Sequence, residues 1–366
     1  MAERTIIKRS IADCFEKFMK QGRVLFFSAP CGFGKTCVAD ALTEGKSVLR
    51  LSAADPDFAV PSKAGSWRIL LIDDLQNLQE DEEWLPLRDL IRDCPDRRFL
   101  LLSRGAPNGT LMAFQYSGLM TVLESKAFLF EREDVRRLLE SWEISASDAD
   151  ISGIYKESIG HPLGVVVTAR RMAQGAPFSL ELVGECFQEV FRYFETAVYR
   201  RFDLPIQRFL LELAPFKSFD LDLARIVTGS HNAGEMLDWL QRNTSMLQYD
   251  GVLHFRFWEQ FRPFLLWEMG REYPPERKRA LMVRDGMYYE LKEDYPNALD
   301  CYIQGQEHAK VSELLIRNAE TFPGMAHYRE MEKYYRKLPE SDILASPALI
   351  QGMSMLCAMS GDYGRL

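Results

Sequence analysis

Short, largely apolar runs alternate with amphipathic stretches over the first third of the chain. The runs lie at residues 24–27, 48–51, 69–72 and 99–102. A run that is apolar at every position is typical of a strand buried on both faces of a parallel sheet. Apolar residues at helical spacing lie before and between the runs, at residues 6–19, 35–42 and 85–94. This alternation predicts a doubly wound α/β domain.

Strand-like runs disappear from about residue 131, and helical patterns follow. The predicted helices cover residues 131–143, 149–158, 164–172, 187–202, 206–213, 221–228 and 233–243. Two short apolar runs, 246–249 and 252–257, then flank Asp250-Gly251, a dipeptide typical of β-hairpins. Helices followed by a hairpin and another helix predict a winged-helix unit.

A tetratricopeptide-type spacing indicates helical repeats after residue 274. The positions that carry it are Gly286, Tyr289, Ala298 and Tyr302. Gly305 departs from the small alanine usual three residues later, and a second helix pair is expected from about residue 346. Because a repeat array needs several stacked units and a cap, we expect the end at Leu366 to be a truncation.

Composition and charge narrow the class of protein. The net charge of −8 gives no general electrostatic attraction to nucleic acid or to an anionic membrane. Seven scattered cysteines without a C-x-x-C pair argue against a disulfide framework and a zinc site. The apolar runs are too short to cross a bilayer, and the first residues are charged and amphipathic, unlike a signal peptide. These features predict a cytoplasmic protein with no membrane association.

Residues 29–36 read Ala-Pro-Cys-Gly-Phe-Gly-Lys-Thr and depart from the P-loop consensus only at the first position. The two glycines can adopt positive φ, which turns successive N–H groups toward phosphates at the N-terminus of a helix. Lys35 is expected to reach the β- and γ-phosphates, and the Thr36 hydroxyl to bind Mg²⁺. A Gly-rich turn without a ligand is the alternative. The predicted nucleotide contacts here are Pro30, Cys31, Gly32, Phe33, Gly34, Lys35, Thr36 and Cys37.

Polar residues follow the next two apolar runs. Asp73 and Asp74 end the run at residues 69–72; Asp73 would hold Mg²⁺ through water, and Asp74 would orient the attacking water as the catalytic carboxylate. The alternative for this pair is a helix N-cap. Arg104 follows the run at residues 99–102, where ligands of open α/β sheets bind, so it is a candidate contact to the γ-phosphate. A solvated arginine at a strand end is the alternative there.

These pieces, in this order, resemble the signal-transducing ATPases with numerous domains (STAND). More narrowly, they resemble the large ATP-dependent LuxR-type transcription regulators, of which the maltose-regulon activator is the familiar member. The segments that carry the resemblance are residues 28–36, 71–74, 102–104, 160–164, 237–247, 261–265 and 288–315.

In the resembled family an alanine before the P-loop proline is usual, so Ala29 is no exception there. The resemblance also implies that Pro162, in a Gly-His-Pro turn, contacts the nucleotide. It implies that ADP locks a closed state and that ATP with an effector opens the protein into an oligomer. The effector, a small molecule or a protein, would bind the helical repeats. Trp258 stands where members often carry a histidine, so no histidine is assigned to a phosphate.

DNA binding is expected only through a C-terminal domain absent from these residues. The best candidate for a DNA-reading helix, residues 233–243, offers Arg242 as its single cation beside Glu235 and Asp238. Base recognition needs several polar side chains that project into the major groove. We therefore expect the winged helix to pack within the protein.

The sequence thus predicts four units. They are a P-loop NTPase domain at 1–128, a helical domain at 129–186, a winged helix at 187–272 and the start of tetratricopeptide-like repeats at 273–366. The expected function is an ATP- or ADP-binding, Mg²⁺-dependent switch that controls a transcription regulator, with slow ATP hydrolysis as an option. The alternative is a turnover ATPase of the AAA+ kind that does remodelling work.

Overall fold

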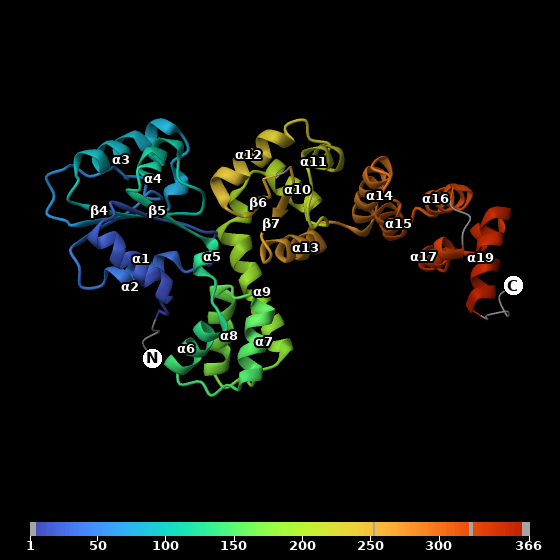
Figure 1. Ribbon diagram of the computed structural model, residues 1–366, viewed down its shortest axis with the longest axis horizontal. Helices are drawn as coiled ribbons and strands as arrows, with labels where there is room; N and C mark the ends of the chain where they lie inside the picture. Colours follow the sequence, from blue (N-terminus) through green and yellow to red (C-terminus); the bar gives the residue numbers. More distant parts are fainter. Residues whose placement is uncertain (1–4, 252, 322–324, 361–366) are drawn as a thin grey trace. The chain divides into compact units, whose positions relative to one another are not determined.

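A computed structural model describes residues 5–251, 253–321 and 325–360 (Figure 1). The chain divides into two compact units. The first comprises Met1–Gln207 with Gly234–Phe264, and the second comprises Arg208–Ala233 with Leu265–Leu366. No helix in the described ranges is long and apolar enough to cross a membrane.

A five-stranded sheet, parallel throughout, is the centre of the first unit. Its order is β2-β3-β4-β1-β5. The strands are β1 (Val24–Ser28), β2 (Val48–Ser52), β3 (Ile69–Asp73), β4 (Arg98–Ser103) and β5 (Met120–Glu124). The four predicted strands are confirmed as β1 to β4. The fifth strand, β5, was not predicted, because this edge strand is only partly buried and lacks a continuous apolar run.

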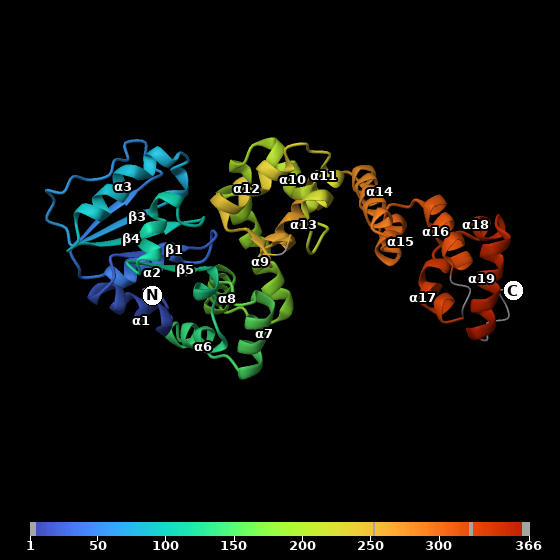
Figure 2. The same ribbon diagram turned by 45° about the horizontal axis from the view of Figure 1, so that its top comes forward.

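Helices cover both faces of this sheet, as the α/β pattern predicts. Helices α1 (Arg9–Lys20) and α2 (Lys35–Thr43) lie on one face, and α3 (Asp81–Asp93) and α4 (Met112–Tyr116) lie on the other (Figures 1 and 2). Short 3-10 turns, η1 (Leu75–Asn77) and η2 (Gly109–Leu111), follow β3 and β4.

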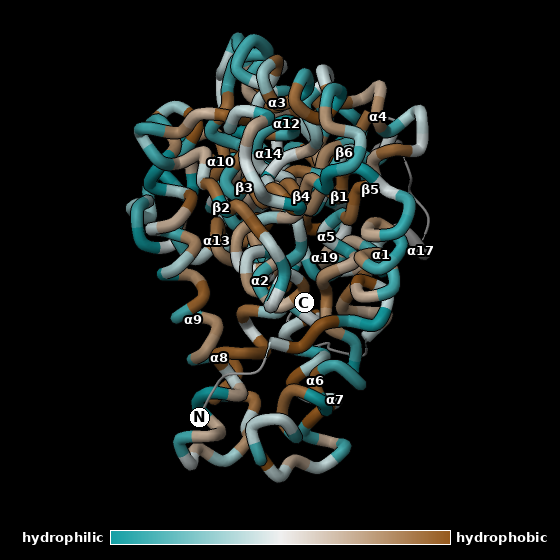
Figure 3. The backbone as a smooth tube through the Cα atoms, turned by 90° about the vertical axis from the view of Figure 1, so that its left-hand side faces the viewer, coloured by the Kyte–Doolittle hydropathy of each residue, from teal (hydrophilic) through white to brown (hydrophobic). Residues whose placement is uncertain are grey.

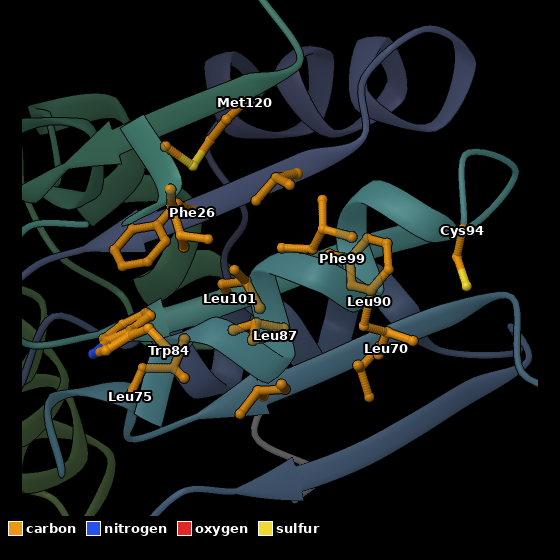
Figure 4. Close-up of a cluster of buried hydrophobic side chains, with 14 of the residues drawn as sticks. Phe26, Leu70, Leu75, Trp84, Leu87, Leu90, Cys94, Phe99, Leu101 and Met120 are labelled. Carbon is orange, nitrogen blue, oxygen red and sulfur yellow. The ribbon is translucent and has the colours of Figure 1, made fainter. Parts of the chain in front are cut away.

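Side chains alternate between the two faces of a strand, so a strand that is buried on both faces presents apolar side chains to the helices on either side. On the α3 side, Phe26, Leu70 and Phe99 of three strands pack against Trp84 and Leu87 of α3 (Figure 4). The hydropathy colouring of Figure 3 shows hydrophobic residues along the central strands β1 and β4. Burial of this kind stabilises by roughly 25 cal/mol per Å² of apolar surface, and it fixes the strand ends that carry the site.

A group of helices follows β5 within the first unit. They are α5 (Ser125–Phe128), α6 (Arg132–Ser141), α7 (Asp148–Ser158), α8 (Pro162–Ala173) and α9 (Leu180–Ala197), which precedes the turn η3 (Tyr199–Arg201). Val135, Leu138, Ile154 and Val165 share a core of their own. N-caps set the helix starts: the Ser147 side chain accepts from Asp150 N, and the His161 side chain accepts from Gly164 N.

The predicted hairpin is present, with a longer loop than the Asp-Gly signal predicts. Helix α12 (Ala233–Thr244) precedes β6 (Leu247–Tyr249), which pairs antiparallel with β7 (Phe255–Phe257) ahead of α13 (Phe261–Glu272). The Asp250 carboxylate accepts hydrogen bonds from Leu253 N and His254 N, which stabilises a wider turn. The predicted second strand therefore begins later, at Phe255; its expected first residue, Val252, lies outside the described residues.

The second unit is helical. It contains most of α10 (Leu204–Leu213), α11 (Leu221–Thr228), α14 (Pro275–Leu291), α15 (Tyr295–Gln304), α16 (His308–Thr321), α17 (Met325–Tyr335), α18 (Glu340–Leu344) and α19 (Pro347–Ser360). Helices α14 and α15 are the predicted pair, and Gly286 faces Tyr302 so closely that a Cβ would lie 2.6 Å from the ring. Helix α19 starts where the second pair is expected; residues 361–363, its expected continuation, lie outside the described residues.

Candidate nucleotide-binding site

Because β1, β3 and β4 are parallel, their carboxyl ends place the candidate residues at one edge of the sheet. The loop after β1 runs directly into α2, whose N-cap is Gly34. Gly34 has φ of 73°, and a Cβ there would meet no heavy atom within 4 Å. Positive φ, and not crowding, is therefore what this position requires. The loop has the conformation that turns backbone N–H groups toward an anion.

Lys35 is the most buried charge at this edge. Its ammonium donates to the carbonyls of Ala29 at 2.6 Å and Pro30 at 3.1 Å. Burial lowers the pKa of Lys35 to about 8, although Cys31 and Asp73 act in the opposite direction. A desolvated ammonium that holds two neutral carbonyls gains most from a negatively charged partner.

Thr36 and Asp73 are in contact at the N-terminus of α2. The Thr36 hydroxyl donates to Asp73 Oδ2 at 2.6 Å, and the other oxygen, Oδ1, accepts from Asp74 N at 2.7 Å. One hydroxyl and one carboxylate are the few protein ligands that Mg²⁺ takes when phosphates and waters supply the rest. Among the described residues, no group of three or more His, Cys, Asp or Glu is placed to hold a metal ion by itself.

Asp74 is held by its neighbours in a left-handed conformation with φ of 57°. Gln76 Nε2 donates to Asp74 Oδ1 at 2.8 Å, and Gln76 Oε1 accepts from the backbone N of Arg104 at 3.0 Å. The guanidinium of Arg104 lies 3.8 Å from Asp74 and donates to the carbonyl of Ala197, at the end of α9. Gln76 therefore fixes a carboxylate and a cation on adjacent strand ends. No sequence motif points to Gln76.

The Gly-His-Pro turn packs directly on the P-loop. Leu163 N donates to the Gly32 carbonyl at 3.1 Å. Gly160 has φ of 70°, a Cβ there would collide with the Phe130 carbonyl, and Phe130 N donates to Gly160 O at 2.8 Å. Only glycine allows this approach, and Pro162 then starts α8 at the rim of the pocket.

One pocket of about 610 Å³ joins these groups. Every predicted site residue lines it except Pro30, whose carbonyl instead accepts from Lys35. The rest of the lining is mainly apolar and was not predicted, with Thr5 and Lys8 among its polar members. The side chains of this apolar end come from the chain start, from α1, from α5 and α6 with their adjoining loops, and from α8: Ile6, Ile11, Phe128, Phe130, Leu138, Trp142 and Val166.

Tyr193 of α9 also borders this pocket, and the sequence did not identify it. Cys31 Sγ and the Tyr193 hydroxyl are 3.2 Å apart and share a hydrogen bond. Burial raises the pKa of Tyr193, so its hydroxyl keeps its proton. Helical spacing alone could not separate this position from the ordinary core positions of α9.

An aromatic cluster closes the outer side of the P-loop. The ring of Phe33 lies 5.3 Å from His161 and 4.5 Å from Trp258, between ring centroids. His161 and Trp258 are 5.4 Å apart, and Phe194 of α9 lies 5.7 Å from His161. Trp258, the residue that departs from the family pattern, therefore packs on Phe33 and His161.

Comparisons with known proteins agree with this architecture. A Walker-type ATPase of Pyrococcus abyssi superposes with a TM-score of 0.55 at 12% identity, covering 72% of this chain and 97% of that one. At that identity the likeness shows the P-loop ATPase fold. Residues 195–277 match the MalT winged helix domain.

The chain has a P-loop ATPase fold and contains a segment that matches the MalT winged helix domain. The matched range is offset from the winged helix predicted at 187–272, and the other unit boundaries stay predictions.

Further solved structures show weaker likeness. A STAND protein with a tetratricopeptide repeat sensor from Pyrococcus horikoshii has a TM-score of 0.34 at 12% identity, covering 96% of this chain and 58% of that one. The Holliday junction branch migration motor RuvB of Thermotoga maritima has a TM-score of 0.39 at 15% identity, over 73% and 96%. No curated protein sequence matches the chain.

Proposed function

We propose that this chain is the nucleotide-gated switch of a transcription regulator. One observation carries the proposal. Three segments distant in sequence meet around a single phosphate-type loop: residues 31–36, the turn at 160–163, and Trp258. A ligand in that loop would contact the loop and border Pro162 and Leu163, and would act on Trp258 only through Phe33, so the ligand's identity can bias whether the three stay packed together.

The phosphate end of the ligand would be held by the P-loop. The N–H groups after Gly32 and the N-terminus of α2 would surround the phosphates, and Lys35 would exchange its two carbonyl partners for phosphate oxygens. Because the ammonium is already desolvated, that exchange adds an anion without a new burial cost.

Mg²⁺ fits the pair formed by Thr36 and Asp73, whose oxygens already meet. When bound, the ion would neutralise charge on the phosphates. Asp74, oriented by Gln76, would hold and polarise a water, and Arg104, which lies 3.8 Å from Asp74, would be the cation for the terminal phosphate. ATP hydrolysis, if it proceeds, would use these residues to reset the switch.

The base and ribose would occupy the apolar end of the pocket. Phe130, Leu138 and Trp142 provide flat, apolar surface there, and Val166 and Pro162 of α8 close it. Such walls suit a purine ring, which buries mainly by stacking and apolar contact. The nucleotide would thus join the sheet domain to helices α6 and α8, so α8 would be the element that responds to which nucleotide is bound.

The proposal assigns DNA binding and signal reception to other parts. The C-terminal end of α12 approaches the loop after β4 so closely that a Cβ on Gly105 would collide with the Arg242 carbonyl, and Arg242 pairs with Asp238 at 2.6 Å. The C-terminal end of this helix is thus packed against the sheet domain, and its one cation is already paired with a carboxylate. Helices α14 to α19 would receive the effector, and self-association would follow activation.

The test compares size and stability across nucleotide states. ADP should raise the melting temperature and keep the chain monomeric, since a ligand stabilises the state that it binds. ATP analogue with effector must favour the open state by roughly 5.5 kcal/mol to move the populations from 1:99 to 99:1. Identical melting and identical scattering profiles with ADP, with an ATP analogue and without nucleotide would contradict the switch.

A further inference from the structure

His161 is held in one tautomer by the helix it starts. Its Nδ1 accepts from Gly164 N at 3.3 Å, as the N-cap of α8. A ring nitrogen that accepts a hydrogen bond carries no hydrogen. Burial lowers the pKa of His161 to about 3, so the ring is neutral and its single hydrogen is on Nε2.

The Nε2 donor of His161 faces the P-loop backbone. A Cβ on Gly32 would lie 3.1 Å from Nε2, and the nearby Cys31 backbone raises the pKa of the ring against the larger effect of burial. The remaining surroundings are the aromatic rings of Phe33, Phe194 and Trp258. Nε2 is buried, and among the described residues it has no hydrogen-bond partner. A buried donor in this condition costs free energy until an acceptor reaches it.

The neighbouring carbonyl shows how the donor would be used. Gly32 O already accepts from Leu163 N, so the turn at 161–163 holds one P-loop carbonyl. When N–H groups of a P-loop turn toward phosphate, the carbonyls of the same peptides turn away from it. Phosphate in the loop would then fix the Cys31 carbonyl on the side where the imidazole lies.

We propose that His161 is a positioning residue, whose Nε2–H donates to the Cys31 carbonyl when phosphate occupies the P-loop. This rests on the proposed function and deepens it: the histidine couples phosphate binding to the N-terminus of α8. One imidazole would thereby link the P-loop backbone, through Nε2, to the helical domain, through Nδ1.

Two substitutions separate the two nitrogens. His161→Asn keeps a side-chain oxygen that can cap α8 but loses the Nε2 donor. His161→Gln can place an amide N–H near the position of Nε2 but loses the short cap. Both remove the ring from the aromatic cluster, so a purely structural role would lower ADP affinity equally in both. His231→Gln, at an exposed position, is the matched control.

The measurement is calorimetric titration of ADP with Mg²⁺ into residues 1–366, together with melting temperatures. We expect His161→Asn to lose about tenfold in ADP affinity and His161→Gln to stay within about threefold of wild type. The melting temperatures should rank in the opposite order. Equal affinities of the two variants, whether lowered or unchanged, would overturn the coupling. Absence of ADP binding by the wild-type chain would instead remove the proposed function.

A measurement on the wild-type protein covers the case in which a variant fails to fold. With five histidines in the chain, ¹⁵N-histidine spectra can resolve His161. We expect the Nε2–H tautomer throughout, with an Nε2 proton that exchanges more slowly with water once ADP is added. An Nδ1–H tautomer, or an Nε2 proton insensitive to ADP, would contradict the assignment.

Discussion

Burial shifts the pKa of a charged group in each unit, and the two outcomes differ. Lys35 in the sheet unit has two carbonyl partners and borders a pocket of about 610 Å³. Asp285 on α14 is 1% exposed, and its Oδ1 has no hydrogen-bond partner among the described residues. Burial lowers the pKa of Lys35 to about 8 and raises that of Asp285 to about 8.

The two groups differ in whether a ligand can offset the free-energy cost of burying them. A ligand can restore the charge of Lys35, because the pocket admits an anion. Asp285 has only fixed neighbours: Arg284 favours its charge, Glu212 opposes it, and Tyr289 and Cys301 lie nearby. The buried charge of Lys35 therefore links to ligand binding, whereas that of Asp285 links to the stability of the helical repeats.

Asp285→Asn should have the largest effect on the repeats. The folded carboxyl keeps its proton up to about pH 8, while the unfolded one releases it near 3.8, so stability falls as pH rises across that interval. The amide removes this slope and should stabilise α14 by about 1–3 kcal/mol near pH 8. Hydrogen exchange of α14 and α15 measures it. Asp300→Asn, at a partly exposed ion pair with Lys333, is the control; equal protection in both variants would break the comparison.

ADP affinity should fall as pH rises above 8, through Lys35. Phosphate needs the protonated ammonium, and the free protein loses that proton with a pKa of about 8. The loss should approach about tenfold per pH unit above that value. Lys35→Arg should bind with little change over the same range, because arginine stays charged. Titrations from pH 7 to about 9.5 decide it, and parallel curves for the two proteins would exclude Lys35 as the cause.

Cysteine reactivity gives the smallest expected contrast. Cys37 is exposed and lines the pocket, so alkylation should be rapid and should slow several-fold when ADP is present. Burial raises the pKa of Cys301 in the repeats to about 12, which leaves little thiolate to react. Mass spectrometry of timed alkylation reads both sites. Cys37 modification at one rate with and without ADP would place the ligand elsewhere.

The sequence predicted those parts of the site that lie at the ends of buried strands. A strand such as 24–28 is buried at every position, so its apolar run and the loop that follows are visible without a structure. The contact between Thr36 and Asp73 follows from the parallel strands, whereas Lys35 bonds to Ala29 and Pro30 of its own loop. By contrast, β5 is half-buried and carries Thr121 and Glu124 within it, so no periodicity separates it from a loop.

The apolar end of the pocket could not be predicted. It depends on Ile6, Phe130 and Val166. These residues come from three segments that meet only because α6 and α8 pack against the sheet domain within the first unit. Each is an ordinary core residue by local pattern. The contact of Trp258 with Phe33 could not be predicted either, because it joins two residues far apart in sequence, one after the hairpin and one in the P-loop. Local patterns specify elements and loops, and tertiary contacts specify which of them share a ligand.

The most direct test of a nucleotide site at Lys35 is calorimetric titration of ADP with Mg²⁺ into wild type and two lysine variants. Lys35→Ala removes a charge-assisted phosphate contact and should weaken binding by about a hundredfold or more, while circular dichroism shows a preserved fold. Lys46→Ala, at an exposed lysine after α2, should bind like wild type. Equal ADP affinity in wild type and Lys35→Ala would contradict the account.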